Sequence, residues 1–259
     1  MPDSALAEIS SEAFIFLGAG AAVLRQMAQP GVGQGVSEHS RTLDDPMGRL
    51  HGTMHYIYVL SLGTEEERRS MARHVNRAHG PVRSDAYSAF DPRLQLWVAA
   101  TLYRGAEELQ QIFCSPLSEQ EHDDLYRSAA LYGTTLQMPE ALWPANRRAF
   151  EDYWQATMAQ ADVSDSVRHY VHALLAGASA PWYVKMLLPL QRLASRALIG
   201  PQLRALYRLP WTAADQRRWD LFLRVFPPLY RRLPGTLRRL PARLYLRAWR
   251  RQQSATQQR

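Results

Sequence analysis

Residues 48–81, GRLHGTMHYIYVLSLGTEEERRSMARHVNRAHGP, decide the fold, because they contain two helices and the signals that separate them. Thr64 precedes three glutamates; its hydroxyl can cap free backbone amides, and carboxylates favour the positive end of a helix. Gly80-Pro81 then ends this helix at about His79. Apolar residues recur at helical spacing on both sides of the boundary, and this pattern predicts an all-α protein.

Similar signals predict helices along the rest of the chain, and no segment alternates between apolar and polar residues for long enough to form a strand. The glycine-rich stretch 30–47 reads as a loop, and prolines beyond position 226 are expected to break the chain into short pieces before a last helix and a disordered SATQQR end. The expected helices are 5–29, 47–62, 64–79, 91–113, 118–132, 139–160, 164–176, 183–199, 212–225 and 242–251. This indicates a single globular domain of about 9–11 helices around a buried pocket.

Charge is distributed unevenly along the 259 residues. The first 190 residues carry a balance of −7, and the remainder carries +14, with Asp215 and Asp220 as its acids. Lys185 is the one lysine, so arginine supplies almost all of the positive charge. We therefore divide the chain into an N-terminal helix at 1–29, a main domain at 30–228 and a basic C-terminal extension at 229–259.

The single cysteine, Cys114, excludes an intramolecular disulfide, which suits a reducing compartment. The N-terminal MPDSALAEISSE carries acids where a secretory signal would carry basic residues. The uncharged run 13–24 has 12 residues, too few to span a bilayer. We expect a cytoplasmic protein without signal peptide or transmembrane helix, able to associate peripherally with a membrane.

Arg49 and Thr53 lie four residues apart, so they share one face of their helix with Tyr56 and Leu60. This face grades from charged to apolar, as the wall of a pocket would. A buried arginine needs an anion or several acceptors. The alternative interpretation is a surface arginine paired with a carboxylate, and the pattern alone leaves both open.

His79 stands at a helix C-terminus, where the dipole favours an imidazolium and a neutral imidazole could equally bind a metal. A capping histidine is the alternative. His51 and His55 form an H-x-x-x-H pair on another face of the preceding helix, but no third ligand for a metal-dependent hydrolase accompanies them.

An ordered set of motifs resembles a known family. R-x-x-x-T at 49–53 is followed by H-x-x-V at 79–82 and by Y-x-A-x-D-P-x-L-x-x-W-V at 87–98. L-S-E-x-E-x-D-x-x-Y at 117–126, the LYG of 131–133 and an arginine-rich, LPW-containing tail follow. Over about residues 30–250 the chain is similar to the MpaB/latex-clearing-protein family, the rubber-oxygenase catalytic domain.

The resemblance implies an all-α fold around haem b, with His79 as the proximal iron ligand and Arg49 and Thr53 as the pocket residues. It also implies O₂-dependent oxidation of a hydrophobic, terpenoid- or lipid-like substrate. The rubber-cleaving branch uses a glutamate ahead of the arginine as a base, and here Glu38 lies in the preceding segment at a different spacing.

Two functions therefore compete. The first is a haem b-dependent oxygenase with Arg49 and Thr53 as catalytic and His79 as metal-binding residues. The second is a non-enzymatic helical module whose basic C-terminal quarter binds anionic membranes or, less favoured, nucleic acid. Arginine interleaved with leucine, tyrosine and tryptophan in RLYLRAW, 243–249, suits an interfacial helix.

Overall fold

The computed structural model describes residues 4–257, and this range is helical apart from its loops and one β-bridge between Arg83 and Ser88. The prediction of an all-α domain is confirmed. The helices are α1 Ala5–Ser11, α2 Ile15–Met27, α3 Pro30–His39, η1 Arg41–Leu43, α4 Pro46–Leu62, α5 Glu65–His79, α6 Pro92–Phe113, α7 Glu119–Ala129, α8 Leu131–Thr134, η2 Glu140–Leu142, α9 Arg147–Ala159, α10 Asp165–Ala176, α11 Trp182–Lys185, α12 Leu188–Leu198, α13 Gly200–Leu206, α14 Ala213–Arg232, α15 Gly235–Arg238 and α16 Leu240–Gln257.

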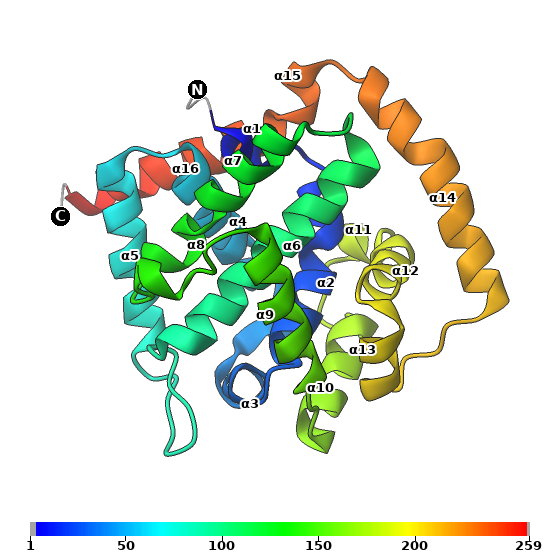
Figure 1. The fold of residues 1–259 in the computed structure, drawn as a ribbon, viewed down its shortest axis with the longest axis horizontal. Coiled ribbons are helices and arrows are strands. Elements are labelled where there is room, and N and C mark those ends of the chain that lie inside the picture. The colour runs from blue at the N-terminus through cyan, green and yellow to red at the C-terminus, as the bar shows by residue number, and fades with distance from the viewer. Residues whose placement is uncertain (1–3, 258–259) are drawn as a thin grey trace.

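The core is built around α2, which runs through the middle of the molecule against α6 and α12 (Figure 1). Trp97 of α6 is buried and donates its indole N–H to the carbonyl oxygens of Arg25 and Gln26, at 3.1 and 3.2 Å. Its ring stacks on Trp154 of α9 at a centroid distance of 5.0 Å. A large aromatic side chain with a satisfied polar end thus joins three helices.

Helices α4 and α5 form as the sequence predicts. Thr64 accepts a hydrogen bond from the backbone of Glu67, and the Glu67 carboxylate accepts one from the backbone of Thr64, so a capping box begins α5. Asp45 caps α4 through the backbone N–H of Gly48, with proline at the first position of the helix. Both helices end at a glycine, as expected.

The prediction of one continuous helix at 5–29 is wrong. The chain forms α1 and α2, which meet at 102° across residues 12–14. Glu12 causes the corner: it is 3% exposed and needs partners that a straight helix would not bring to it. No single described helix is long and apolar enough to cross a membrane, although the bent pair of α1 and α2 reaches that combined length. Residues 1–3 of the predicted N-terminal helix lie outside the described range.

The stretch predicted as a loop, 30–47, instead contains α3 and η1. Pro30 stands in the first turn of α3, and the Gln29 side chain caps it through the N–H of Val32. The glycines suggested a loop, but they serve close packing. A Cβ at Gly33 would lie 2.4 Å from the carbonyl oxygen of Met27.

The C-terminal quarter also differs from expectation. Helix α14 continues through Pro227 and Pro228, which were expected to break the chain, so it crosses the position 228 at which we placed a domain boundary. Helix α16 continues to Gln257 where SATQQR was expected to be disordered; residues 258–259 lie outside the described range. The range 183–199 divides into α11 and α12, so the described chain has more helices than expected.

Candidate functional site

Helix α4 places the predicted pocket residues on successive turns of one face. Arg49 and Thr53 are joined within the helix, because the Thr53 hydroxyl donates to the carbonyl oxygen of Arg49 at 3.1 Å. One turn further, the hydroxyl of Tyr56 donates to the carbonyl oxygen of Tyr132 in α8 at 2.5 Å. The hydroxyl hydrogen of Thr53 is therefore used by its own helix, and its lone pairs remain free to accept.

Arg49 has an unusual combination of properties. Its side chain is exposed, yet surrounding protein desolvates its guanidinium and lowers its pKa, while Tyr170 acts electrostatically in the opposite direction. Within residues 4–257 it forms no ion pair and donates no side-chain hydrogen bond. The alternative interpretation, an arginine neutralised by a carboxylate at the surface, is wrong for the described chain.

His79 ends α5 on the face that carries buried Met71 and partly buried Val75. Burial, and then the charge of Arg49, lower the pKa of His79 to about 4. The imidazole is therefore neutral near pH 7, because desolvation outweighs the pull of the helix C-terminus. Its Nδ1 is buried without a hydrogen-bond partner among the described residues, whereas Nε2 is not buried in this way.

Residues that the sequence did not single out complete the surroundings. Tyr170 of α10 is 5% exposed, and its hydroxyl has no partner in the described chain. Tyr170 lies between His169 and His172 in the chain, and no local signal in the sequence marks it as a functional residue. A second group, the side-chain amides of Asn76, Gln137 and Gln95, forms a hydrogen-bonded chain with contacts of 3.0 and 2.6 Å that ties the last turn of α5 to α6.

Glu38, the acid that precedes Arg49 in the sequence, is hydrogen-bonded to Tyr87 and Gln34. Its carboxylate accepts a hydrogen bond from the hydroxyl of Tyr87 at 2.6 Å and another from Gln34 at 2.9 Å. The hydrogen bond from Tyr87, more than any other cause, lowers the pKa of Glu38. His39 contacts the same tyrosine hydroxyl at 3.0 Å. A carboxylate stabilised in its charged form is a weak base, so Glu38 is poorly suited to the role that its place in the sequence suggested.

The H-x-x-x-H pair packs against α16. The rings of His51 and His55 lie 5.5 and 5.2 Å from the ring of Tyr245, and His55 also contacts Trp249 at 6.0 Å. Burial first, and then the charge of His51, lower the pKa of His55. In the part of the chain that the structure describes, no three His, Cys, Asp or Glu side chains converge as a metal site. Nothing here supports the metal-dependent hydrolase.

Among the described residues, a neutral imidazole at the end of α5 thus lies near a guanidinium of α4 that has no ion pair. Residues 7–228 match the family described as ER-bound oxygenase mpaB/B′/rubber oxygenase, catalytic domain. The chain belongs to this family of oxygenases, and the resemblance seen in the motifs is confirmed.

Similar proteins occur in mycobacteria. Uncharacterized proteins of Mycobacterium bovis and Mycobacterium tuberculosis are each 36% identical to this chain over 222 residues, which cover 82% of this chain and 87% of the relative. No solved structure matches the chain significantly.

Proposed function

We propose that the protein is a haem b-dependent oxygenase that uses O₂ to oxidise a hydrophobic, terpenoid- or lipid-like small molecule. One observation carries this proposal: His79 is held neutral beside the unpaired Arg49, in a chain that belongs to an oxygenase family. Iron is bound by a neutral imidazole, so the lowered pKa of His79 suits the role of proximal ligand.

The other side chains of the pocket fit the same group. Arg49 is exposed, yet protein atoms around it desolvate its guanidinium and lower its pKa. Left without an anion, such a guanidinium is costly, and a haem propionate would pair with it. The hydroxyls of Thr53 and Tyr170 offer an acceptor and an unsatisfied donor.

Haem, when bound, supplies the binding and activation of O₂. The protein's part is to hold His79 in its neutral form, to orient the last turn of α5 through Asn76 and Gln137, and to exclude water with the buried tyrosines. The Nδ1 of His79 has no acceptor to fix its tautomer in the described chain, which departs from the usual pattern of metal-binding histidines.

The test is an absorption spectrum of protein purified from haem-supplemented cells. Wild type and His169→Ala, which removes an exposed histidine of α10, should both show a Soret band. His79→Ala should lose the band while keeping its far-UV circular dichroism, and added imidazole should restore it by filling the vacated ligand position. Wild type that stays colourless after reconstitution with haemin, or a His79→Ala variant with an unchanged spectrum, refutes the proposal.

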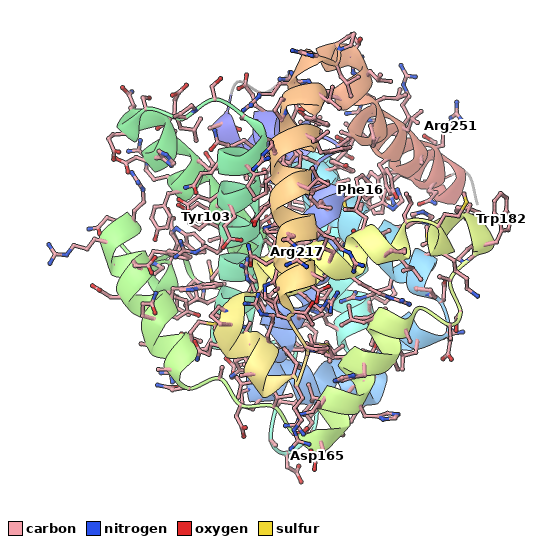
Figure 2. The ribbon with its side chains drawn as sticks, turned by 90° about the vertical axis from the view of Figure 1, so that its right-hand side faces the viewer. Phe16, Tyr103, Asp165, Trp182, Arg217 and Arg251 are labelled. Atoms are coloured by element: carbon pink, nitrogen blue, oxygen red, sulfur yellow. The ribbon has the colours of Figure 1, made fainter. Side chains whose placement is uncertain are left out.

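We also propose that the protein reaches its lipophilic substrate from an anionic membrane surface, which is the part of the alternative function that an observation favours. Trp182, Tyr183, Met186 and Leu187 are 74%, 51%, 69% and 64% exposed, and Trp182 projects at the margin of Figure 2. Contiguous apolar side chains in water mark an interaction site, and the aromatic residues suit a membrane interface.

The charge of α16 suits the same surface. A hollow of about 280 Å³ beside α16 is lined by apolar Leu246 and by Arg239, Arg243, Arg247 and Arg250.

Truncation at 229 would be a poor test, because Tyr230 and Trp249 are part of the core. Binding to vesicles that contain phosphatidylserine should fall in the Trp182→Ser/Leu187→Ser variant and with salt. Unchanged binding would refute the membrane role.

A further inference from the structure

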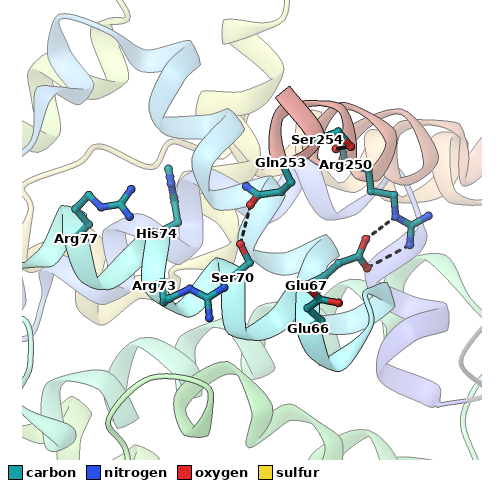
Figure 3. A pocket seen from close by; sticks show the side chains of 9 residues that line it. All are labelled: Glu66, Glu67, Ser70, Arg73, His74, Arg77, Arg250, Gln253 and Ser254. Atoms are coloured by element: carbon teal, nitrogen blue, oxygen red, sulfur yellow. Dashed lines mark hydrogen bonds and ion pairs between the residues drawn. The ribbon is translucent and has the colours of Figure 1, made fainter. Parts of the chain in front are cut away.

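A hollow of about 520 Å³ lies between α5 and α16, and His79 is not among the residues that line it. Figure 3 shows that its walls come from these two helices alone. Its lining consists of Glu66, Glu67, Ser70, Arg73, His74, Arg77, Arg250, Gln253 and Ser254.

Two contacts between the helices hold the groove open in a fixed shape. Arg250 donates to both carboxylate oxygens of Glu67, at 2.6 and 3.2 Å. The hydroxyl of Ser70 donates to Oε1 of Gln253 at 2.8 Å. Because α5 and α16 are cross-linked at both points, a ligand would enter a preformed site and would not have to order it.

The charge that remains in the groove is positive. Glu67 and Arg250 neutralise each other, and elsewhere on α5 Glu65 is paired with Arg69. The carboxylate of Glu66, which also lines the groove, offsets one of the two positive charges of Arg73 and Arg77, so one positive charge remains. Arg73 and Arg77 have neither an ion pair nor a side-chain hydrogen bond within residues 4–257. They lie one turn apart on the same face of α5, where like charges repel each other. An anion between them would remove this repulsion.

The polar side chains nearby supply further contacts. His74 stands between the two arginines in the sequence and lines the same groove, with its ring edge-on to the buried Trp249 at 5.7 Å and 82°. The hydroxyls of Ser70 and Ser254, on the opposing helices, already donate to Oε1 of Gln253 and to the carbonyl oxygen of Arg250, so they help to fix the walls of the groove. The groove therefore presents two guanidinium groups and an imidazole, with the carboxylate of Glu66 at its edge.

We propose that this groove binds a phosphate monoester or diphosphate group. Guanidinium groups bind phosphate oxygens bidentately, and two adjacent forks match a dianion with several oxygens better than a single carboxylate. The volume exceeds that of a phosphate and lies in the range of small-molecule sites, so the organic part of the ligand fits beside it. The phosphate belongs either to a soluble molecule or to a lipid headgroup.

The site is separate from the proposed haem pocket. It lies on the outer face of α5, whereas Met71 is buried on the inner face, with Val75 one turn and His79 two turns further on. The proposal thus stands whether or not the protein binds haem.

Isothermal titration of the full chain with pyrophosphate at constant ionic strength tests the proposal. Wild type should bind one equivalent saturably, and Arg73→Ala/Arg77→Ala should weaken the affinity by at least about tenfold, the effect of losing charge-assisted hydrogen bonds. Arg217→Ala/Arg224→Ala, which removes two exposed arginines of α14, is the matched control and should bind as wild type does (Arg217 is labelled in Figure 2). Circular dichroism checks the fold of both variants.

Absence of saturable binding, equal binding by Arg73→Ala/Arg77→Ala, or an equal loss in the α14 control overturns the proposal. A second arm separates the two sources of phosphate. Vesicles that contain phosphatidic acid should bind, with competition by pyrophosphate, if the ligand is a lipid headgroup. Pyrophosphate binding without competition at the vesicle identifies a soluble ligand. The Soret band of the double variant should match wild type, so a failure here is distinguishable from a failure of the haem assignment.

Discussion

Glu12, at the corner between α1 and α2, is expected to be a main support of the fold. It accepts hydrogen bonds from the hydroxyl of Tyr230 at 2.8 Å and from Arg238 and Arg239 at 3.1 Å each. The Glu12 side chain is 4% exposed, and those of the two arginines are 21% and 33% exposed. Replacement by glutamine keeps the shape and removes the charge.

Removing one partner of a buried ion pair costs about 3–5 kcal/mol. Glutamine retains one acceptor and the arginines keep some contact with water, so we expect Glu12→Gln to lower the free energy of unfolding by about 2–3 kcal/mol. At about 2–4 °C per kcal/mol for a domain of this size, the Tm should fall by about 4–12 °C.

Thermal and urea unfolding followed by circular dichroism measure this change. Glu8→Gln is the matched control, because Glu8 is an exposed glutamate of α1, and its loss should leave the Tm nearly unchanged. A Glu12→Gln variant that is no less stable than Glu8→Gln would contradict this role of Glu12. An Arg238→Ala variant that loses as much stability as Glu12→Gln would contradict it too, because the carboxylate is bound at three points.

Two further changes follow from the same structure. Gly33→Ala should destabilise the fold by about 1–3 kcal/mol, because its Cβ would meet the carbonyl oxygen of Met27 at 2.4 Å. A Cβ at Gly105 in α6 meets nothing within 4 Å, so Gly105→Ala should stabilise the fold by about 0.5–1 kcal/mol. Equal Tm values for the two variants would contradict this. Hydrogen bonding from Arg250 lowers the pKa of Glu67, so their pair stabilises the fold above the ordinary pKa of glutamate and stops doing so as pH falls through the lowered pKa. The stability difference between wild type and Arg250→Ala, about 1 kcal/mol or less at pH 7, should vanish in acid, and a difference that grows in acid would refute the assignment.

Local signals in the sequence were sufficient for the helices that position the pocket. The hydroxyl of Thr64 ahead of three glutamates and the glycine after His79 define α5, and Gly63 marks the end of α4. The sequence prediction instead places Asp45 and Pro46, which begin α4, in the loop 30–47. The helical period then places Arg49 and Thr53 on one face. The class of fold and the family follow from such signals, because each depends on residues within a few turns of each other.

The sequence predictions are wrong where contacts between residues far apart in the chain override the local helical preference. The corner at Glu12 exists because residues 230–239 supply its partners, and nothing near position 12 shows this. Pro227 and Pro228 are tolerated inside α14 because Phe222, Phe226 and Tyr230 place their rings within 6.5 Å of Phe113. In the site, Tyr170 approaches Arg49 from α10, at a distance in sequence that no spacing rule covers.

The corner at Glu12 also has a consequence for how the chain folds as it is made. Helix α2 is the centre of the core, and α12 packs against it from about 170 residues further along the chain. During synthesis the apolar faces of α1 and α2 therefore stay uncovered until α12 and the partners of Glu12 at residues 230–239 have left the ribosome. Chaperone dependence during synthesis, and aggregation of any product that stops short of α14, are what this topology implies for a cell that makes the protein.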